Sequence, residues 1–371
     1  MVSTLMKEPL LFTPGPLTTS MKTKKSMLVD YGSWDDEFIN ITSKIRKKVI
    51  KIIKGNKDYT CVLLQGSGSF GVEAMIINFV RKNEPIIILI NGAYGERIQQ
   101  ICQHHKIKYV PFVWDEEKSL DLIKLRKVLN KNNKIKHLAF VHCETSTGIL
   151  NPLKEVSDIC KKNKINLYID AMSSFGALDI DANKIHFKAV VASPNKCLEG
   201  VPGINFCIAK TNDIKRCKGI SDNLSMDLYD QWDYMEKTGR WRYTPPTHVV
   251  IAFLRALEQF EKEGGLKGRF KRYNQNLKTL ISEMTKIGFT SLLSKSVQAP
   301  IIVTFISPSD KKFRFNRFYN RLKKKGFIIY PGKMAKRDSF RIGCIGNIGK
   351  KEIKMLTNEI AKFIKMEKIT L

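Results

Sequence analysis

Two residues of this sequence, an aspartate and a lysine, are placed so that their carboxylate and amine could act on the same bound group. Asp170 closes the apolar run 165–169, and Lys196 comes just after the apolar run 189–192, about one strand–helix unit later. A lysine amine can form a Schiff base with an aldehyde, and a carboxylate can keep a pyridine nitrogen protonated so that the ring accepts electrons from a carbanion. The pair therefore suits chemistry with pyridoxal phosphate, provided that neighbouring segments can hold such a group.

A segment rich in glycine and serine, Gln65 to Ser69, lies between an apolar run and a helical pattern. Its glycines permit close approach of the backbone, and its serine hydroxyls and the free N–H groups of the following helix can donate hydrogen bonds to a phosphate. Ser67, Gly68 and Ser69 are therefore candidate phosphate ligands. The segment is neither a Walker loop nor a dinucleotide fingerprint, and a plain tight turn is the competing interpretation.

Two further segments follow apolar runs and are expected at the same edge of a sheet, where open α/β sheets bind ligands. Tyr94, flanked by glycines within 91–97, could stack on a pyridine ring or serve a purely structural role. Thr145, within 144–148, could bond the phenolic oxygen of the cofactor or the carboxylate of Asp170, or its segment could cap a helix. His142 is predicted to be a core histidine rather than a catalytic base.

The elements that must position these residues alternate from about residue 45 to residue 210. Short apolar runs indicate strands, and the apolar residues within 72–80 recur at helical spacing directly after the glycine- and serine-rich segment. The predicted strands are 61–64, 86–90, 109–113, 138–142, 167–170, 189–192 and 204–209. Alternating strands and helices with runs rich in isoleucine and valine indicate an α/β fold, in which a mostly parallel sheet is covered by helices on both faces.

The pattern changes after about Gly264. A long basic helix is predicted at 267–287, and the shorter strands and helices after it indicate a smaller α+β domain. These strands are predicted at 301–306, 327–330 and 340–342, and the helices at 313–325 and 350–364. We therefore predict a large cofactor-binding domain at 21–264 and a small domain formed by 265–371 together with the N-terminal segment 1–20.

The composition indicates a globular protein of the cytoplasm. The chain has 371 residues, of which 43% are hydrophobic, and its apolar runs are too short to cross a bilayer. The first sixteen residues lack the hydrophobic core of a signal peptide. The 8 cysteines form no C-x-x-C pair, which argues against a zinc site or a disulfide framework and favours a reducing compartment. We expect no membrane partner.

The net charge of +29 is the one unusual value. Such a charge by itself suggests a polyanion such as nucleic acid, but the lysines are spread along the whole chain and no nucleic-acid-binding motif accompanies them. We therefore expect no nucleic-acid partner. Solvated basic faces are one interpretation of the charge, and a positive field that steers an anionic substrate toward the site is the other.

Many short segments, in order along the chain, match those of one known family. They are Leu11 to Ser20, Ser33 to Asp36, Leu63 to Gly68, Asn91 to Gly95, Asp170 to Gly176, Asn195 to Cys197, Gly200 to Gly203, Trp241 to Thr244, Tyr330 to Lys333 and Phe340 to Gly343. On these segments the chain resembles, essentially end to end, the 2-aminoethylphosphonate–pyruvate aminotransferases in the class V branch of the fold-type I pyridoxal phosphate enzymes. Two small departures, Ser69 in place of threonine and Pro194 in place of alanine, do not alter the activity that this resemblance implies.

The resemblance implies roles for the residues around the cofactor. Lys196 would be the Schiff-base lysine, Asp170 the partner of the pyridinium nitrogen and Tyr94 the residue stacked on the ring. The cofactor phosphate would be held by Ser67, Gly68, Ser69 and Asn195. Thr145 is kept as a further candidate contact to the cofactor.

Other matching residues are implied in substrate binding and in contacts between subunits. Arg341 would hold a substrate carboxylate. The candidates for binding a phosphonate are Ser33, Trp34 and Arg242, each of which could instead be structural. Thr244, with Trp241 as a further candidate, would reach the cofactor phosphate from the neighbouring subunit, which implies a homodimer with shared active sites.

The implied reaction is transamination of 2-aminoethylphosphonate with pyruvate, which gives phosphonoacetaldehyde and L-alanine in phosphonate metabolism. Pyridoxal 5′-phosphate is the implied cofactor, and no metal is expected. The nearest alternative is another class V aminotransferase that uses serine, alanine or a different amino donor with a 2-oxo acid. The competing class is a basic nucleic-acid-binding protein on a degenerate enzyme scaffold, against which the intact set of Asp170, Lys196 and 66–69 argues.

Overall fold

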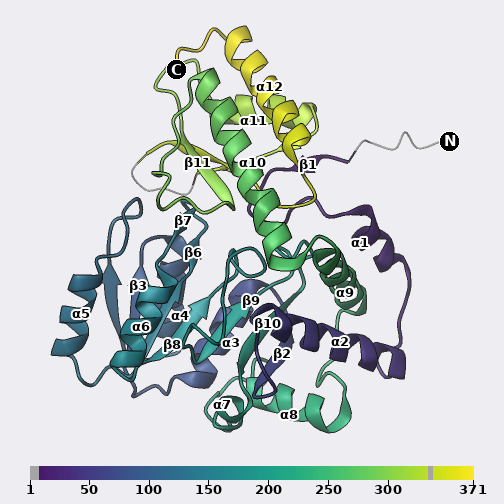
Figure 1. Cartoon of the computed structure of the whole chain (residues 1–371), viewed down its shortest axis with the longest axis vertical. Helices are drawn as coiled ribbons and strands as arrows, with labels where there is room; N and C mark the ends of the chain where they lie inside the picture. Colours follow the sequence, from purple (N-terminus) through teal and green to yellow (C-terminus); the bar gives the residue numbers. More distant parts are fainter. Residues whose placement is uncertain (1–7, 333–336) are drawn as a thin grey trace.

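A computed structural model of the chain describes residues 8–332 and 337–371 (Figure 1). Residues 1–7 of the predicted N-terminal segment, and Lys333 of the matched segments, lie outside the described residues. Within the described part, no helix is long and apolar enough to cross a membrane.

A seven-stranded sheet forms the centre of the larger part of the molecule. In spatial order its strands are β2 (Tyr59–Gln65), β10 (Ile204–Lys210), β9 (Ala189–Ala192), β8 (Asn166–Asp170), β5 (His137–Val141), β3 (Ile86–Ile90) and β4 (Tyr109–Val113). Strand β10 runs antiparallel to both of its neighbours, and the other neighbouring pairs are parallel. The prediction of a mostly parallel sheet is confirmed.

Helices cover both faces of this sheet, because successive strand residues point to opposite sides and both sides are apolar. In β2, Cys61 and Leu63 join the core cluster on one face, whereas Val62 and Leu64 join the cluster on the other. The first face is covered by α2 (Asp36–Ile52), α5 (Leu122–Lys131), α6 (Leu153–Lys162) and α9 (Thr247–Lys262). The second face is covered by α3 (Gly68–Phe79), α4 (Ala93–His104), α7 (Thr211–Lys215) and α8 (Leu228–Thr238).

The C-terminal part is built on a smaller sheet with a core of its own. Its antiparallel strands are β11 (Ile302–Ile306), β14 (Ser339–Gly343) and β13 (Tyr330–Pro331), and its helices are α11 (Phe315–Lys324) and α12 (Lys350–Met366). Shorter elements elsewhere in the chain include α1 (Met21–Lys25), a 3-10 turn η1 (Ser26–Leu28), and the short strands β6 (Cys143–Glu144) and β7 (Ile149–Leu150). The division into domains at residue 264 stays a prediction.

The predicted strand at 327–330 is wrong as a single element. Its first half, β12 (Phe327–Ile328), pairs in parallel with β1 (Leu10–Leu11), and its second half pairs with β14. The chain changes partners at Ile329, which is fully buried. Local hydrophobicity indicates that the whole run is buried, but it carries no information about which strand each half will pair with.

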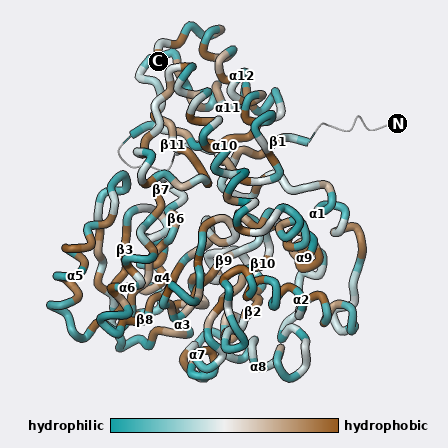
Figure 2. The backbone as a smooth tube through the Cα atoms, viewed as in Figure 1, coloured by the Kyte–Doolittle hydropathy of each residue, from teal (hydrophilic) through white to brown (hydrophobic). Residues whose placement is uncertain are grey.

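The long helix α10 (Gly265–Ile287) joins the two parts of the molecule (Figure 1). It begins directly after Gly264 and ends directly before Gly288. Both glycines have a positive φ, which glycine adopts easily because it has no Cβ. Its 23 residues span about 35 Å at the rise of an α-helix. Figure 2 shows hydrophobic and hydrophilic residues alternating along it, as expected for a helix with one buried face.

Candidate active site

A cavity of about 160 Å³ lies at the carboxyl ends of β2, β3, β5, β8 and β9. Parallel strands bring their C-terminal ends to one edge of a sheet, so segments far apart in sequence meet there. The structure brings together eight of the predicted site residues, which line this cavity: Ser67, Gly68, Ser69, Tyr94, Thr145, Asp170, Asn195 and Lys196. Their roles in binding stay predictions.

Asp170 is the last residue of β8 and is almost fully buried. Burial raises the pKa of its carboxyl to about 6; the N–H of Met172, which donates to Oδ1 at 2.9 Å, opposes this rise, and the nearby charge of Glu144 adds to it. A cationic partner in the cavity would favour the charged form of Asp170. This is the environment that a protonated ring nitrogen requires.

Lys196 follows β9 and meets the N-terminal segment of the chain. Its Nζ donates a hydrogen bond to the carbonyl oxygen of Gly15 at 3.3 Å. Gly15 has φ +122°, and a Cβ at this position would lie 2.5 Å from Lys196 Cδ. Only glycine therefore lets the backbone pass so close to the amine. Sequence reasoning placed Gly15 inside a matched segment but gave it no role.

The segment from Ser67 to Ser69 forms the start of α3, with Ser67 as its N-cap. Helix N-termini attract anions because their backbone N–H groups are unpaired and the helix dipole is positive there. The space above this helix start is narrow, since a Cβ on Gly68 would lie 2.6 Å from Met172 Sδ. A small residue is thus required where a phosphate would approach.

Arg97 completes this anion site, and sequence reasoning missed it. Its Nη1 donates to Ser69 Oγ at 2.8 Å, and its guanidinium lies 4.9 Å from the centre of the Tyr94 ring. Arg97 lies one helical turn after Tyr94 on α4, so the available signal was a basic residue three positions beyond a predicted site residue. The side chain also lines the cavity.

Glu144 holds the start of α4 beneath the cavity. Its buried carboxylate accepts hydrogen bonds from the N–H groups of Tyr94 at 3.2 Å and Gly95 at 3.3 Å. Burial raises the pKa of Glu144, and hydrogen bonds from Ser146, Gly95 and Tyr94 oppose that rise. The segment 144–148 thus includes a helix-capping residue, Glu144, which positions the Tyr94 ring.

The hydroxyl of Thr145 lies 2.6 Å from that of Ser173 and, within the described part of the chain, makes no hydrogen bond to Asp170. Thr145 nonetheless lines the cavity. His142 is buried, as predicted, and its Nδ1 lies 3.0 Å from Ser174 Oγ. Burial lowers the pKa of His142 to about 4, so the ring is neutral at physiological pH.

Arg341, on β14, is 2% exposed; it does not itself line the cavity but reaches the segment of Thr145, which does. Its Nε donates to Pro331 O at 3.0 Å and its Nη1 to Thr145 O at 2.9 Å. Burial lowers the pKa of Arg341, and the nearby Tyr94, Tyr330 and Glu144 oppose this shift, although none of the described acidic side chains forms an ion pair with Arg341. A buried guanidinium held by carbonyl groups alone is well suited to receive an anionic ligand.

The structure places Trp241 away from the cavity of its own chain. Its side chain is buried in the core of the larger part, and its indole N–H donates to Thr42 Oγ1 at 3.1 Å. A large aromatic ring gains more from apolar burial than from a surface position, and here its one polar group is already bonded. A contact of Trp241 with the cofactor of a neighbouring subunit stays a prediction.

Four other predicted residues lie outside the cavity of a single chain. Trp34 is exposed beneath the guanidinium of Arg240, and Arg242 pairs with Asp230 at 3.1 Å. Ser33 is half-buried, and Thr244 is exposed. The carbonyl of Thr244 accepts from Gln65 Nε2 at 3.0 Å, which places it beside the strand that leads into the Ser67 segment.

Comparison with known proteins gives a consistent result. The family described as aminotransferase class-V matches residues 25–332. A 2-aminoethylphosphonate–pyruvate transaminase from Pseudomonas aeruginosa is 46% identical over 364 residues, covering 98% of each chain. A protein with the same name from Pseudomonas putida is 48% identical over 357 residues, covering 96% of this chain and 97% of its own.

Solved structures share the whole fold at low sequence identity. Pyridoxamine–pyruvate aminotransferase from Mesorhizobium loti superimposes with a TM-score of 0.89 at 18% identity, covering 98% of this chain and 94% of its own. Ureidoglycine–glyoxylate aminotransferase from Bacillus subtilis gives the same TM-score and identity, with coverage of 100% and 96%. The predicted fold-type I architecture is confirmed.

Proposed function

Because this chain belongs to the class V aminotransferase family, we propose that it transfers the amino group of 2-aminoethylphosphonate to pyruvate, giving phosphonoacetaldehyde and L-alanine. The chain is a pyridoxal 5′-phosphate-dependent aminotransferase. One observation carries the choice of substrates: relatives named for this reaction are 46% and 48% identical over nearly the full length. The breadth of that match favours this reaction over those of other class V aminotransferases.

The residues at the cavity fit pyridoxal phosphate by their chemistry. Lys196 supplies an amine for the aldehyde, and buried Asp170 supplies a carboxylate for the protonated ring nitrogen. The start of α3 and Arg97 supply hydrogen-bond donors for the phosphate. Gly68 leaves the space that a Cβ would fill. When bound, this cofactor supplies an electron-poor ring that stabilises negative charge on the reacting carbon of the substrate.

Lys196 is assigned two tasks in this proposal. Its Nζ would hold the cofactor by its aldehyde, and as a free amine Nζ would accept the proton from the reacting substrate carbon. The carbonyl of Gly15, which accepts from Nζ, keeps the amine close to this position. Asp170 would pair as a carboxylate with the ring nitrogen, and Tyr94, whose N–H donates to Glu144, would stack on the ring.

Arg341 is assigned to the acidic end of both substrates. The carboxylate of pyruvate and the phosphonate of the amino donor are anions, and each charge-assisted hydrogen bond to a guanidinium contributes about 1.5–3 kcal/mol. Donors for the additional phosphonate oxygen are proposed from Ser33, Trp34 and Arg242. In a single chain these three lie outside the cavity, so this part of the proposal requires a second subunit.

A homodimer with shared active sites is part of the same proposal. Exposed apolar side chains lie near the phosphate end of the cavity, among them Phe70 at 52%, Leu224 at 69% and Tyr243 at 38% exposed. Tyr243 Oη donates to Leu224 O at 3.4 Å, and Gln65 Nε2 donates to Tyr243 O at 3.2 Å, so these residues form one surface. Covering this surface by a second copy would remove apolar area from water and bring Thr244 toward the partner's cavity.

We also propose a cytoplasmic location, which agrees with eight buried free thiols.

The test is a half-reaction with purified holoenzyme. Addition of 2-aminoethylphosphonate without an acceptor should abolish the visible absorbance of the bound cofactor, at roughly 410–430 nm, and pyruvate should restore it. Absorbance that is unchanged by 2-aminoethylphosphonate but lost with alanine or serine would move the assignment to another class V aminotransferase. Lys196→Ala, which lacks the amine, is the control that should show neither change.

A further inference from the structure

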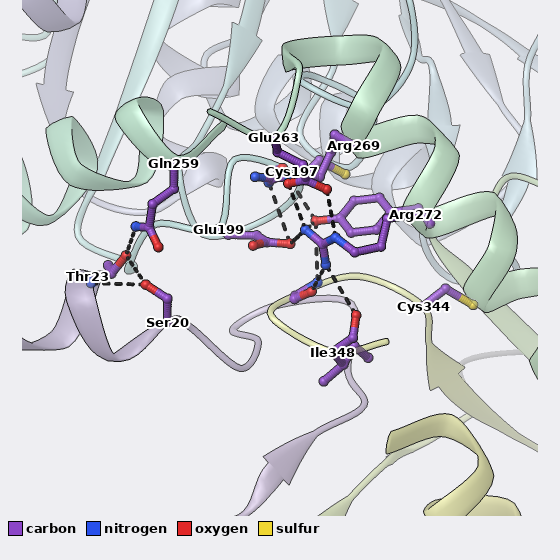
Figure 3. A network of polar contacts seen from close by, with 12 residues as sticks. Ser20, Thr23, Cys197, Glu199, Gln259, Glu263, Arg269, Arg272, Cys344 and Ile348 are labelled. Atoms are coloured by element: carbon purple, nitrogen blue, oxygen red, sulfur yellow. Dashed lines mark hydrogen bonds and ion pairs between the residues drawn. The ribbon is translucent and has the colours of Figure 1, made fainter. Parts of the chain in front are cut away.

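An ionic network lies between α10 and the loops that follow Lys196 and β14 (Figure 3). Glu263 accepts hydrogen bonds from Arg269 Nε and from Arg272 Nε, each at 2.7 Å, and Arg272 Nη2 reaches Glu199 Oε1 at 2.7 Å. Arg269 is 1% exposed, although it carries a full charge. Two arginines and two glutamates balance each other in this network, so each charge is paired.

One side of the network holds the loop of Lys196. Glu199 lies three residues after Lys196, and its N–H donates to the carbonyl of Lys196 at 2.8 Å. Glu199 has φ 58°, a left-handed conformation that is unusual for a residue with a side chain. Tyr273 Oη donates to its carboxylate at 2.6 Å, and Arg269 Nη1 donates to the carbonyl of Cys197.

The other side holds the loop that follows β14, the strand of Arg341. Arg272 Nη1 donates to the carbonyls of Gly346 and Ile348, the latter at 3.2 Å. The N–H of Gly346 donates to Tyr273 Oη at 3.3 Å. Two residues of α10, Arg272 and Tyr273, therefore contact both the lysine loop and the loop that begins directly after the Arg341 strand.

Buried ion pairs contribute little net stability, because removal of each charge from water offsets most of the attraction between them. The same groups fix geometry strictly, since every donor and acceptor must stay paired. Burial alone would raise the pKa of Glu263, but the hydrogen bonds and charges of Arg272 and Arg269 outweigh it and lower that pKa. The network is therefore better explained by placement of the two loops than by stability.

We propose that Glu199, Arg272 and Tyr273, which we call the α10 bracket, set the position of Lys196 relative to Arg341. These are positioning residues, since they act through the two loops and not on the substrate. The inference rests on the proposed function, in which Lys196 acts on the amine end and Arg341 binds the acidic end of one short substrate. A misplacement of 1 Å between two such groups can lower a rate by about a hundredfold.

Two variants test the bracket, and a third serves as the control. Glu199→Gln removes one charge while keeping the side-chain shape, and Tyr273→Phe removes one hydroxyl without changing any charge. The control is Glu283→Gln on the same helix, whose carboxylate pairs with Lys286 at the surface at 2.9 Å and contacts neither loop. Half-reaction rates of each holoenzyme are measured with 2-aminoethylphosphonate and with L-alanine. The rate at which methoxyamine, an amine that lacks an acidic group, displaces Lys196 from the cofactor is measured as the loss of visible absorbance.

We expect both bracket variants to react about tenfold to a hundredfold more slowly with the two acidic substrates, with a raised KM. Their reaction with methoxyamine should stay within about twofold of wild type, because it needs Lys196 and the cofactor but not Arg341. Glu283→Gln should match wild type with all three compounds. Arg272→Lys, which keeps the charge but has fewer donors, should fall between wild type and Glu199→Gln.

Three outcomes would overturn the bracket. Equal slowing with methoxyamine and with the acidic substrates would mean that the network acts on Lys196 alone. Lower melting temperatures with unchanged rates would mean that it only stabilises the fold. If Glu199→Gln does not fold, wild-type rates in Tyr273→Phe would count against the proposal. A wild-type enzyme that reacts with alanine but not with 2-aminoethylphosphonate would refute the proposed function. The rates of the bracket variants with alanine and with methoxyamine would then still test whether the α10 bracket positions Lys196 relative to Arg341.

Discussion

The chemistry of Asp170 depends on its surroundings more than on its residue type. Burial at the end of β8 raises its pKa to about 6, well above the range of an exposed aspartate. A positively charged ring nitrogen beside it would favour the carboxylate form. Cofactor binding and ionisation of Asp170 should therefore support each other, and the protein without cofactor should be less stable for the same reason.

This linkage predicts how Asp170→Asn changes the stability of the cofactor-free protein. Because the folded-state pKa is raised, the folded state holds the proton more tightly than the unfolded state. The stability that this proton contributes is present below the unfolded pKa of about 4 and is lost as the pH rises through about 6. Relative to wild type, Asp170→Asn should gain about 2 kcal/mol in the free energy of unfolding between pH 4 and pH 7.5.

Urea unfolding of both cofactor-free proteins at the two pH values measures this difference. His142 and the other titrating groups are shared by the two proteins, so their contributions cancel in the comparison. The same difference between variant and wild type at both pH values would show that Asp170 ionises normally. The variant should also bind the cofactor more weakly, since the ring nitrogen loses its charged partner.

At the scale of elements, the N-terminal segment 10–20 links the small sheet to Lys196, the proposed catalytic lysine. Strand β1 pairs with β12, the N–H of Gly343 donates to Phe12 O, and the carbonyl of Gly15 accepts from Lys196 Nζ. Two residues of this segment, Phe12 and Gly15, therefore contact the end of the Arg341 strand and the amine of Lys196, respectively. Helix α10 links the same two regions from the opposite side, through its ionic network.

Gly15→Ala should disturb the enzyme through Lys196 and not only through backbone strain. The new Cβ would lie 2.5 Å from Lys196 Cδ, closer than two carbon atoms can approach, so the lysine or the segment must move. We expect kcat to fall by about tenfold or more, together with a shift in the cofactor absorbance.

Gly326→Ala is the matched control for this substitution. Gly326 also has a positive φ, of 84°, but a Cβ there would have no neighbour within 4 Å. Gly326→Ala should therefore lower stability by about 1–2 kcal/mol while leaving kcat and the cofactor absorbance unchanged. Equal effects of the two substitutions on kcat would show that the conformation of Gly15, and not its contact with Lys196, is what matters.

At the scale of the whole molecule, Thr244 and Arg242 lie outside the cavity but next to an exposed apolar surface. Phe70, Leu224 and Tyr243 form this surface, beside the strand that leads into the phosphate segment. The proposed dimer would place this surface against a second copy. Each active site would then depend on residues from two chains.

Mixing two inactive variants tests this sharing. Lys196→Ala lacks the amine, and Thr244→Asp places a negative charge where the partner's phosphate is expected. Each homodimer should be inactive, but half of the dimers formed after mixing and refolding would carry one intact site of two, giving about a quarter of wild-type activity. No recovery, in a mixture shown to contain heterodimers, would contradict a contribution of Thr244 to the partner's site.

Local patterns in the sequence determine much of this protein. Alternation of apolar runs with helical spacing is a property of neighbouring residues, and it predicts the strands of the central sheet together with α3 and α10. The same patterns place Asp170, Lys196, Tyr94 and the Ser67 segment after strands. Because parallel strands end at one edge of a sheet, that order alone brings these residues to a common cavity.

Contacts between distant parts of the chain are decided only by the tertiary structure. The hydrogen bond from Arg97 to Ser69, the approach of Gly15 to Lys196, the burial of Trp241 and the division of 327–330 between two partners each depend on segments that are far apart in sequence. By sequence, Arg269 and Arg272 are two charges of a basic helix, yet both meet carboxylates brought to them by the fold. Periodicity reports which side of an element is buried, but it does not identify the residue that lies opposite.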